Sequence, residues 1–158
     1  MDKFNKRARE IIEQILYITI ATASKDGKPW NAPVYSASDK EYNFYWASDQ
    51  NGQHSQNIAD NGHVFLVIYD STVPEGTGEG VYIKAKAYAL TEKTEIAEAL
   101  GYLYRRKNQD PKKREVKEFL GSYPRRIYKA VPEKVWMNSG GEKNGNFIDI
   151  RVEIDLTK

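Results

Sequence analysis

The chain has 158 residues, near the usual size of one domain and long enough to bury a core. Its 24 basic and 22 acidic side chains leave a formal charge of +2, which argues against a dedicated nucleic-acid partner, and the absence of cysteine excludes disulfides and thiolate metal or redox sites. No apolar run approaches the roughly 18 residues of a membrane span, and the first residues do not resemble a signal peptide, so we expect a cytoplasmic, soluble protein with no membrane partner.

The first part of the chain predicts a helix followed by antiparallel strands. Apolar residues recur at helical spacing over about 3–14 and predict an amphipathic helix. Residues 17–23 are rich in β-branched side chains, and the Asp26-Gly27 pair after them is a strong hairpin signal. A second strand is expected over 30–37, where Pro33 indicates an edge or an interrupted ladder. An aromatic third strand follows, and we expect the three strands to form a meander.

A polar segment after the aromatic strand is the first candidate binding site. Residues 47–52 predict a turn, 53–60 a short helix and 64–69 another strand. Backbone N–H groups at a helix start point outward, and the helix dipole favours negative charge there. Side-chain donors at the same place would add to this anion site: Ser48, His54, Ser55 and Asn57. The alternative interpretation is a solvated turn capped by serine and asparagine.

The second part of the chain predicts a helical insertion between strands. The glycines of 76–80 precede a strand-like segment, 81–88, so they do not form a dinucleotide fingerprint, which requires a following helix. Thr91 and Asp110-Pro111 are start signals for two helices. The remaining residues are expected to form strands over 125–131 and 134–137 around a turn at Pro132, a loop over 138–146, and a last strand over 147–154. These elements predict a single α+β domain on a small closed barrel.

Several motifs, taken together in order and spacing, point to a known family. They are Ala21-Thr22 with Asp26-Gly27-Lys28-Pro29, Ala32-Pro33-Val34, Phe44-Tyr45-Trp46-Ala47-Ser48, His54-Ser55-Gln56-Asn57-Ile58, Asn61-Gly62-His63-Val64 and residues 80–87, with fainter matches at Val135-Trp136-Met137 and Asp149-Ile150-Arg151. In this respect the chain resembles the pyridoxamine 5′-phosphate oxidase-like family of FMN-binding split barrels. The resemblance implies one domain over 1–158, with a six- to seven-stranded antiparallel split β-barrel, an N-terminal helix and a helical insertion before the last strands.

The resemblance also implies a cofactor and a partner. We expect a homodimer with FMN in clefts between the subunits. The flavin ring would lie along two strands, at Asn31, Ala32, Pro33 and Val34 and at Trp46, Ala47 and Ser48. The phosphate would lie at Gln53, His54 and Ser55, where a charged imidazole would help and binding should weaken as the pH rises above the pKa of His54. Trp136 would reach the flavin edge from the partner subunit, although it could equally be a core aromatic residue, and Arg151 could instead pair with a nearby carboxylate.

The chain departs from the true oxidases at the charged positions. On the second strand they carry arginine and lysine, where this chain has neutral Asn31 and Ser36 or Ala37. Gln53-His54 stands where they carry Arg-Lys, and their Arg-x-His substrate motif is not matched around 147–149. We therefore expect weaker FMN binding and no vitamin B6 oxidation. No acid–base pair stands out, so no catalytic residue is assigned, and two histidines without cysteine make a poor metal site.

Three functions remain open from the sequence. The first is a flavin-dependent oxidoreductase acting on an unidentified small substrate. The second is a flavin-binding protein without turnover, connected with stress response. The third is a barrel of the same kind that holds another planar cofactor, a deazaflavin or haem.

Overall fold

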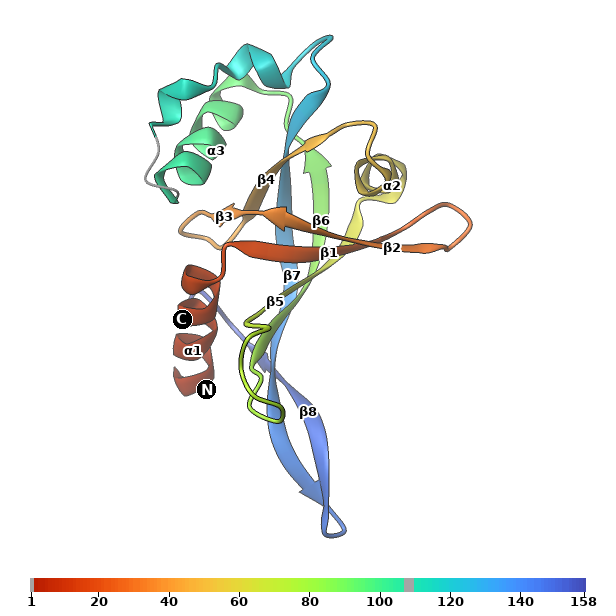
Figure 1. The fold of residues 1–158 in the computed structure, drawn as a ribbon, viewed down its shortest axis with the longest axis vertical. Helices are drawn as coiled ribbons and strands as arrows, with labels where there is room; N and C mark the ends of the chain where they lie inside the picture. Colours follow the sequence, from red (N-terminus) through yellow and green to blue (C-terminus); the bar gives the residue numbers. More distant parts are fainter. Residues whose placement is uncertain (1, 107–109) are drawn as a thin grey trace.

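The computed structural model describes residues 2–106 and 110–158, in which helices and antiparallel strands form the predicted α+β fold (Figure 1). The elements are α1 (Asp2–Gln14), β1 (Tyr17–Ala23), β2 (Pro29–Tyr35), β3 (Ala37–Ser38), β4 (Phe44–Asp49), α2 (Gln53–Asn61), β5 (His63–Tyr69), β6 (Gly80–Ala89), α3 (Lys93–Arg106), the 3-10 turns η1 (Pro111–Lys113) and η2 (Val116–Phe119), β7 (Arg125–Lys143) and β8 (Asn146–Ile154). Over these described ranges, every helix is too short or too polar to cross a bilayer.

The strands form one eight-stranded antiparallel sheet that is rolled into a split barrel. Its order is β2-β1-β5-β6-β7-β4-β3, with β8 paired to β7. Consecutive strands β2 and β3 therefore lie at opposite edges, and the chain crosses between the edges at buried Ser36, whose N–H donates to the Leu16 carbonyl over 3.0 Å. The expected edge position of Pro33 is confirmed. The expected meander of three strands is wrong, because β4 pairs with β7 and not with β2. The expected closed barrel is wrong as well, because the sheet is open between its edge strands β2 and β3.

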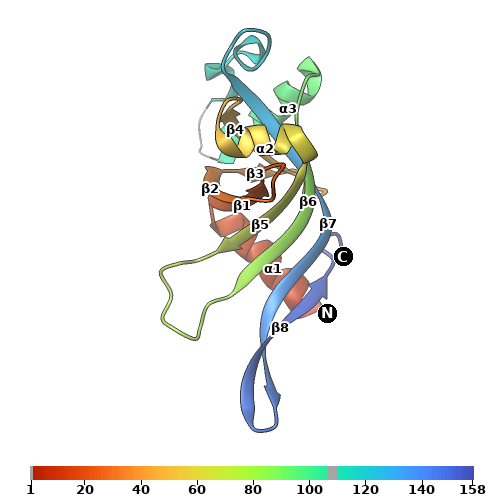
Figure 2. The same cartoon turned by 90° about the vertical axis from the view of Figure 1, so that its right-hand side faces the viewer.

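The last two strands differ most from the prediction. β7 runs unbroken through Pro132, because its register with β6 shifts between Lys84 and Ala85 and leaves Glu133 as the extra residue of a bulge. The loop expected over 138–146 is wrong: β7 continues to Lys143 and turns back at Asn144-Gly145, both with positive φ. This Asn-Gly pair is a hairpin signal that the sequence interpretation overlooked. The resulting β7–β8 arm, Asn138–Arg151, extends past the barrel (Figure 2).

The helical insertion and α1 cover two different parts of the sheet. α1 buries Ala8, Ile11 and Ile12 against the inner sheet face, where alternate residues of β1, β5 and β6 are also buried. α3 and η2 pack over the outside of β3 and β4 in a second apolar cluster (Figure 1). The second predicted helix is therefore two short 3-10 turns, although Asp110 does cap the first by accepting from the Lys112 N–H.

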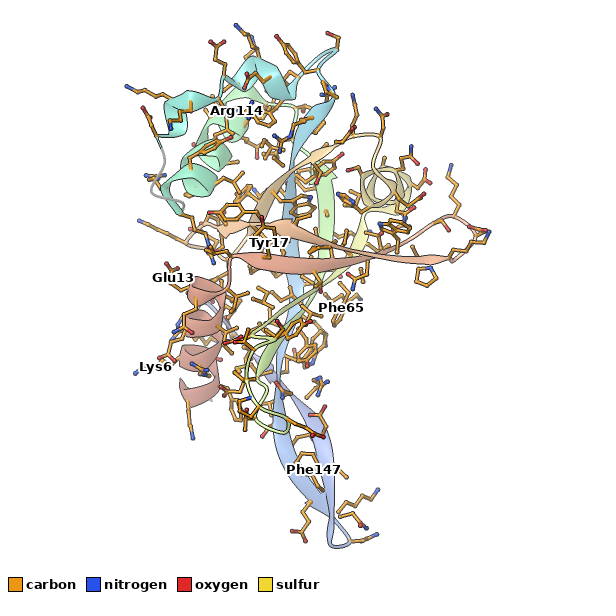
Figure 3. All side chains as sticks on the ribbon, in the orientation of Figure 1. Lys6, Glu13, Tyr17, Phe65, Arg114 and Phe147 are labelled. Carbon is orange, nitrogen blue, oxygen red and sulfur yellow. The ribbon has the colours of Figure 1, made fainter. Side chains whose placement is uncertain are left out.

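The opposite side of β1, β5, β6 and β7 is only partly covered. We call this side the outer face and define it by five residues: Thr19, Phe65, Val67, Tyr82 and Trp136. All but Phe65 are paired with one another across the four strands and form one register row, and Phe65 lies beside this row. The rings of Phe65 and Trp136 stack with centroids 6.3 Å apart, and the Arg151 guanidinium lies 4.2 Å from the Tyr82 ring centroid. Phe65 points away from α1 (Figure 3). Its side chain is 38% exposed although it is a large apolar group.

Candidate functional site

The start of α2 presents backbone donors that the chain itself does not use. The N-cap residue is Gly52, which has no side chain to cap the helix, and the first turn contains no acidic residue. In the described part of the chain, the N–H groups of Gln53, His54 and Ser55 donate no hydrogen bond. Uncapped N–H groups and the positive end of the helix dipole together favour an anion at this end of α2.

His54 ties the first turn of α2 to the end of β4. Its Nε2 lies 2.9 Å from the Ser48 hydroxyl, and both side chains are largely or wholly removed from solvent. Burial lowers the pKa of His54 below its ordinary value, so the imidazole is neutral at neutral pH. His54 therefore acts as a hydrogen-bonding group toward Ser48, and its expected role toward a phosphate stays a prediction.

A second set of hydrogen bonds ties α2 to the β1–β2 hairpin. Asn57 Nδ2 donates to the Thr22 hydroxyl over 2.9 Å, and this hydroxyl lies 3.4 Å from the Trp30 carbonyl oxygen, to which it donates. Gln53 Nε2 donates to Asn57 Oδ1 over 2.9 Å. Trp30, Gln53 and Asn57 border a cavity of about 330 Å³ between α2 and the hairpin, whose lining also includes Ser24, Asp26, Lys28 and Pro29.

The other side of α2 borders a cavity of about 310 Å³, lined by Gln50, Ser55, Ile58, Ala59, Tyr88, Ala89, Arg126 and Tyr128. Ser55 is buried, and its hydroxyl has no hydrogen-bond partner among the described residues. Burial raises the pKa of the Tyr128 phenol, and the Ser55 hydroxyl, which lies close to the phenol without meeting the geometry of a hydrogen bond, partly offsets this effect. Trp46 stacks on Tyr128 with centroids 5.6 Å apart, and its indole N–H is likewise buried without a partner.

The two strands expected to hold a planar ring both have open edges. β2 pairs only with β1, and beyond Tyr45 β4 pairs only with β7, so each strand has an edge whose backbone groups have no ladder partner in the described sheet. On β2, Asn31 and Pro33 are exposed, Ala32 is half-buried and Val34 is buried. On β4, Ala47 is half-buried and Ser48 buried, while the Trp46 side chain is 0% exposed, so only its main chain faces this edge.

Trp136 lies away from the other predicted residues. It is half-buried on the outer face of β7, stacked on Phe65. β1, β5 and β6 separate β7 from β2 in the order of the sheet. The structure thus brings Ser48, Gln53, His54 and Ser55 together around α2, whereas Trp136 lies on another part of the sheet, and its expected role toward a cofactor stays a prediction.

Thr22 and Trp30 are site residues that the sequence interpretation missed. Thr22 is buried and follows Ile18 and Ile20 on the inner face of β1, so its polar side chain breaks an apolar alternation. A buried hydroxyl at such a position needs a partner, and this was the available signal. Trp30 directly follows the hairpin turn and is 49% exposed, which is unusual for the largest apolar side chain.

Comparisons with known proteins agree with this fold. A family model described as pyridoxamine 5′-phosphate oxidase matches residues 4–138, while no curated protein matches the chain. A solved structure of a proposed 5-nitroimidazole antibiotic resistance protein from Bacteroides thetaiotaomicron has 16% identity and a TM-score of 0.66, with 84% of this chain and 81% of that chain covered. The heme storage protein HutZ from Vibrio cholerae has 13% identity and a TM-score of 0.68, with 82% of this chain and 91% of that chain covered. A heme binding protein from Mycobacterium smegmatis has 15% identity and a TM-score of 0.67, with 93% of this chain but 57% of that chain covered.

Proposed function

The chain belongs to the pyridoxamine 5′-phosphate oxidase family, and from this membership we propose that it is a homodimeric FMN-binding protein and a flavin-dependent oxidoreductase acting on a small substrate. The observation that carries the proposal is the uncapped start of α2 beside the open edges of β2 and β4. A flavin nucleotide has a planar ring with polar edges and an anionic tail, and these two features of the chain are complementary to it.

The first turn of α2 would hold the phosphate. Its three free N–H groups belong to Gln53, His54 and Ser55, and the buried Ser55 hydroxyl still has a hydrogen bond to make. Positive charge is scarce, because burial disfavours the charged form of His54 and the Lys28 ammonium already lies 2.9 Å from the Asp26 carboxylate. Arg126 lines the cavity beside Ser55, but its guanidinium already donates to backbone carbonyls within residues 121–125. We therefore propose that phosphate binding depends mainly on backbone donors, with lower affinity than a site built from arginine and lysine would have.

The edges of β2 and β4 would hold the flavin ring. Main-chain groups at 31–34 and 46–48 can bond the polar edge of a ring, and Pro33 offers an exposed apolar surface. When bound, the flavin supplies hydride or electron transfer. The protein would orient it and exclude water, and no residue is assigned as a catalytic acid or base.

The outer face would form the dimer interface. It exposes stacked aromatic and aliphatic side chains next to Arg151, a composition enriched at the centres of protein interfaces. Pairing two outer faces about a two-fold axis along the strands sets β7 of one subunit against β2 of the other. This arrangement would bring Trp136 to the partner's flavin, whereas in its own chain β1, β5 and β6 lie between β7 and β2 in the sheet.

Haem is the second candidate, since two of the structural neighbours are named for heme. His63 is the imidazole that would suit it, because it is exposed on the outer side of β5, with Nε2 2.9 Å from the Lys86 ammonium. A haem iron would need this nitrogen, so haem binding would require the Lys86 contact to break.

The absorption spectrum of the purified protein separates the candidates. Flavin absorbs at about 450 nm, and haem gives a much stronger band at about 400 nm. A flavin spectrum therefore supports the proposal, and a haem spectrum overturns it. Anaerobic reduction by a nicotinamide donor and fast reoxidation by an added acceptor would then distinguish an oxidoreductase from a non-catalytic flavin-binding protein.

Titration with FMN tests the phosphate assignment. Gln53→Glu places a carboxylate at the first turn of α2 and should weaken FMN binding about tenfold, whereas Gln14→Glu, the same change at the exposed end of α1, should leave it unaltered. Equal affinity in both variants would contradict the assignment.

A further inference from the structure

β8 is an edge strand whose outer edge is free along its whole length. Among the described strands it pairs only with β7, and of its nine residues only Ile154 is buried. Most of the strand lies on the β7–β8 arm, which extends past the barrel (Figure 2). An unpaired edge of this length is a template for pairing with another strand, and folded proteins usually cover or block such edges. The proposed function makes no use of this edge.

The arm is poorly stabilised by its own two strands. The residues of β7 that face the middle of β8 have small side chains or none: they are Ser139, Gly140 and Gly141. A Cβ on Gly141 would lie 3.2 Å from the Ile148 side chain and 3.4 Å from that of Ile150, so both isoleucines pack on bare backbone. Ile150 is 40% exposed. A two-stranded ribbon is marginally stable in water, and the arm lacks the third strand that would stabilise it.

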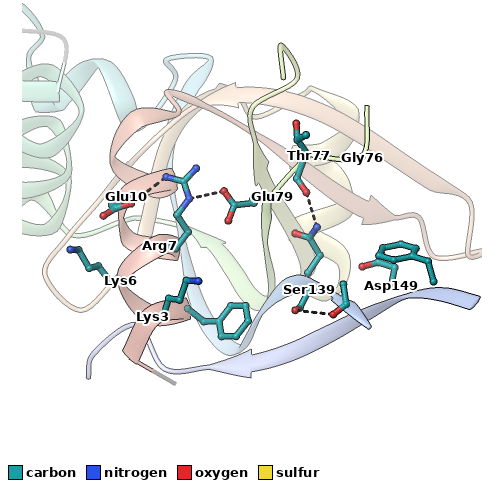
Figure 4. Close-up of a pocket in the computed structure, with 14 residues that line it drawn as sticks. Lys3, Lys6, Arg7, Glu10, Gly76, Thr77, Glu79, Ser139 and Asp149 are labelled. Carbon is teal, nitrogen blue, oxygen red and sulfur yellow. Dashed lines mark hydrogen bonds and ion pairs between the residues drawn. The ribbon is translucent and has the colours of Figure 1, made fainter. Parts of the chain in front are cut away.

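The base of the arm is held in place, so its free edge keeps a fixed direction. Asn138 on β7 donates to the Gly78 carbonyl over 2.8 Å. The glycine-rich loop, residues 70–79, is in turn tied to α1 by Arg7, whose Nε donates to the Glu79 carboxylate over 2.7 Å (Figure 4). An edge that is already positioned loses little conformational freedom when it pairs.

The geometry of the hairpin determines which backbone groups of β8 face outward. Asn144 and Gly145 both have positive φ, as in a two-residue type I′ turn, so the flanking residues Lys143 and Asn146 form a hydrogen-bonded pair. Hydrogen-bonded and non-hydrogen-bonded pairs alternate along an antiparallel ladder. The odd-numbered residues of 147–153 therefore direct their N–H and C=O groups away from β7, and among the described residues these groups have no partner.

The side chains of β8 are self-complementary in one antiparallel register. When two copies meet about a two-fold axis at Ile150, Asp149 of each copy lies opposite Arg151 of the other, and the outward-facing odd-numbered residues meet one another. Ile148 then lies opposite Val152 on the other face of the ribbon. Moving the axis by one residue in either direction sets Arg151 against Arg151 or Asp149 against Asp149, and like charges directly opposite destabilise a sheet. Charge and backbone pattern thus select a single register.

From this free and self-complementary edge, we propose that two copies of the chain pair along β8 in antiparallel register about Ile150, which joins their sheets into one. The Asp149 carboxylate lies 2.6 Å from the Arg151 guanidinium of its own strand, so pairing places four charges of alternating sign around the axis. One pair of strands buries less area than a standard interface. We therefore expect this association to be weaker than the outer-face dimer and to follow it as a further step at high protein concentration.

Sedimentation velocity of the full chain tests the proposal with two charge variants. Asp149→Arg and Arg151→Asp each set like charges opposite one another, so each should weaken the further association step about tenfold. Their equimolar mixture should associate as the unaltered protein does, because one copy then carries both cationic groups and the other both carboxylates. Glu142→Arg makes the same change of charge on the β7 side of the arm and should leave the step unaltered.

Amide hydrogen exchange reports on the edge itself. The N–H groups of Asp149 and Arg151 face away from β7, so in the unaltered protein they should become protected as the protein concentration rises. The N–H group of Glu142 faces away from β8 at the opposite edge of the arm, and it should stay unprotected at every concentration.

Three outcomes would overturn the proposal. The first is an unaltered protein without the further association step and without protection of the Asp149 and Arg151 amides, which would leave the edge to another partner. The second is a step that Glu142→Arg weakens as much as Asp149→Arg does, which would indicate a non-specific effect of charge. The third is a mixture of the two charge variants that associates no better than either alone. A dimer that persists in Asp149→Arg is the outer-face dimer, since Asp149 is not part of that face, so the two interfaces are tested separately.

Discussion

The imidazole of His54 and the hydroxyl of Ser48 lie 2.9 Å apart, which joins the first turn of α2 to the end of β4. The contact fixes the direction in which the free N–H groups of this turn point.

Ser48→Ala removes the bond and should cost about 1 kcal/mol of unfolding free energy and weaken FMN binding several-fold, because a loosened turn presents its donors less well. Urea unfolding and fluorescence titration of FMN measure the two effects. Ser122→Ala, at an exposed turn, should change neither quantity, and unaltered FMN affinity in Ser48→Ala would count against the phosphate site.

His54 should make stability depend on pH below neutrality. Its pKa in the folded protein is lowered by burial, so the folded state binds a proton less readily than the unfolded chain, in which histidine has its ordinary pKa of 6.5. The contribution of neutral His54 to the free energy of unfolding is then fully present above about pH 6.5 and is lost as the pH falls toward the pKa of His54 in the folded protein. The melting temperature of the unaltered protein should fall between pH 7 and pH 5 by more than that of His54→Gln. Parallel pH profiles for the two proteins would show that another group is responsible.

Thr22 and Asn57 provide a test of the link between α2 and the β1–β2 hairpin. Thr22→Val keeps the shape of the side chain but leaves the buried Asn57 Nδ2 group without its acceptor, which should cost about 1–3 kcal/mol. Thr19→Val is the matched control three residues earlier on β1, where the hydroxyl makes only a 3.5 Å contact with the Val67 carbonyl. Urea denaturation should separate the two variants clearly. Equal stability would mean that Asn57 finds another acceptor or water.

Local signals predicted the parts of the fold whose residues interact with near neighbours. The alternation of 17–23 and the Asp26-Gly27 turn predicted β1 and its hairpin with β2, and the short helix over 53–60 is confirmed as α2 to within one residue. Pro132 misled the prediction of β7, because a proline is accommodated there only through a bulge against β6, a strand more than forty residues earlier. Such pairing is a tertiary property that local pattern does not contain.

β4, the aromatic strand of the candidate site, shows the same limit of prediction from local sequence patterns. Phe44, Tyr45 and Trp46 are all buried, so β4 does not alternate. The reason is that Phe44 and Trp46 face the main core while Tyr45 packs against the cluster under α3, which covers the other side of the strand. The sequence motif identified the segment, but burial of the Trp46 ring could not be predicted without knowing what lies on each side. The roles assigned to these residues toward FMN remain predictions.

Arg106 connects the ends of two helices and should be important for stability. Its Nη2 donates to the Ile12 and Ile15 carbonyls over 2.5 and 2.7 Å, which satisfies free acceptors at the C-terminus of α1. Arg106→Ala should cost about 2–3 kcal/mol, because bonds from a charged donor are lost and the carbonyls lose their partner. Arg105→Ala is the control, since among the described residues its exposed side chain donates only to the Gly101 carbonyl and lies over the Tyr102 ring, both in its own helix. A melting temperature lowered equally in both variants would contradict this role.

A charge on the outer face should separate the proposed dimer and release the flavin with it. Val67 lies at the centre of the register row between Thr19 and Tyr82, so Val67→Glu would bury a carboxylate without a partner in the interface. Light scattering should show a shift from dimer to monomer, together with at least tenfold weaker FMN binding, because the partner's Trp136 is removed. Val73→Glu makes the same change in the exposed glycine-rich loop and should alter neither property. A Val67→Glu protein that stays dimeric would place the interface elsewhere, and a monomer that keeps full FMN affinity would show that one subunit suffices for the site.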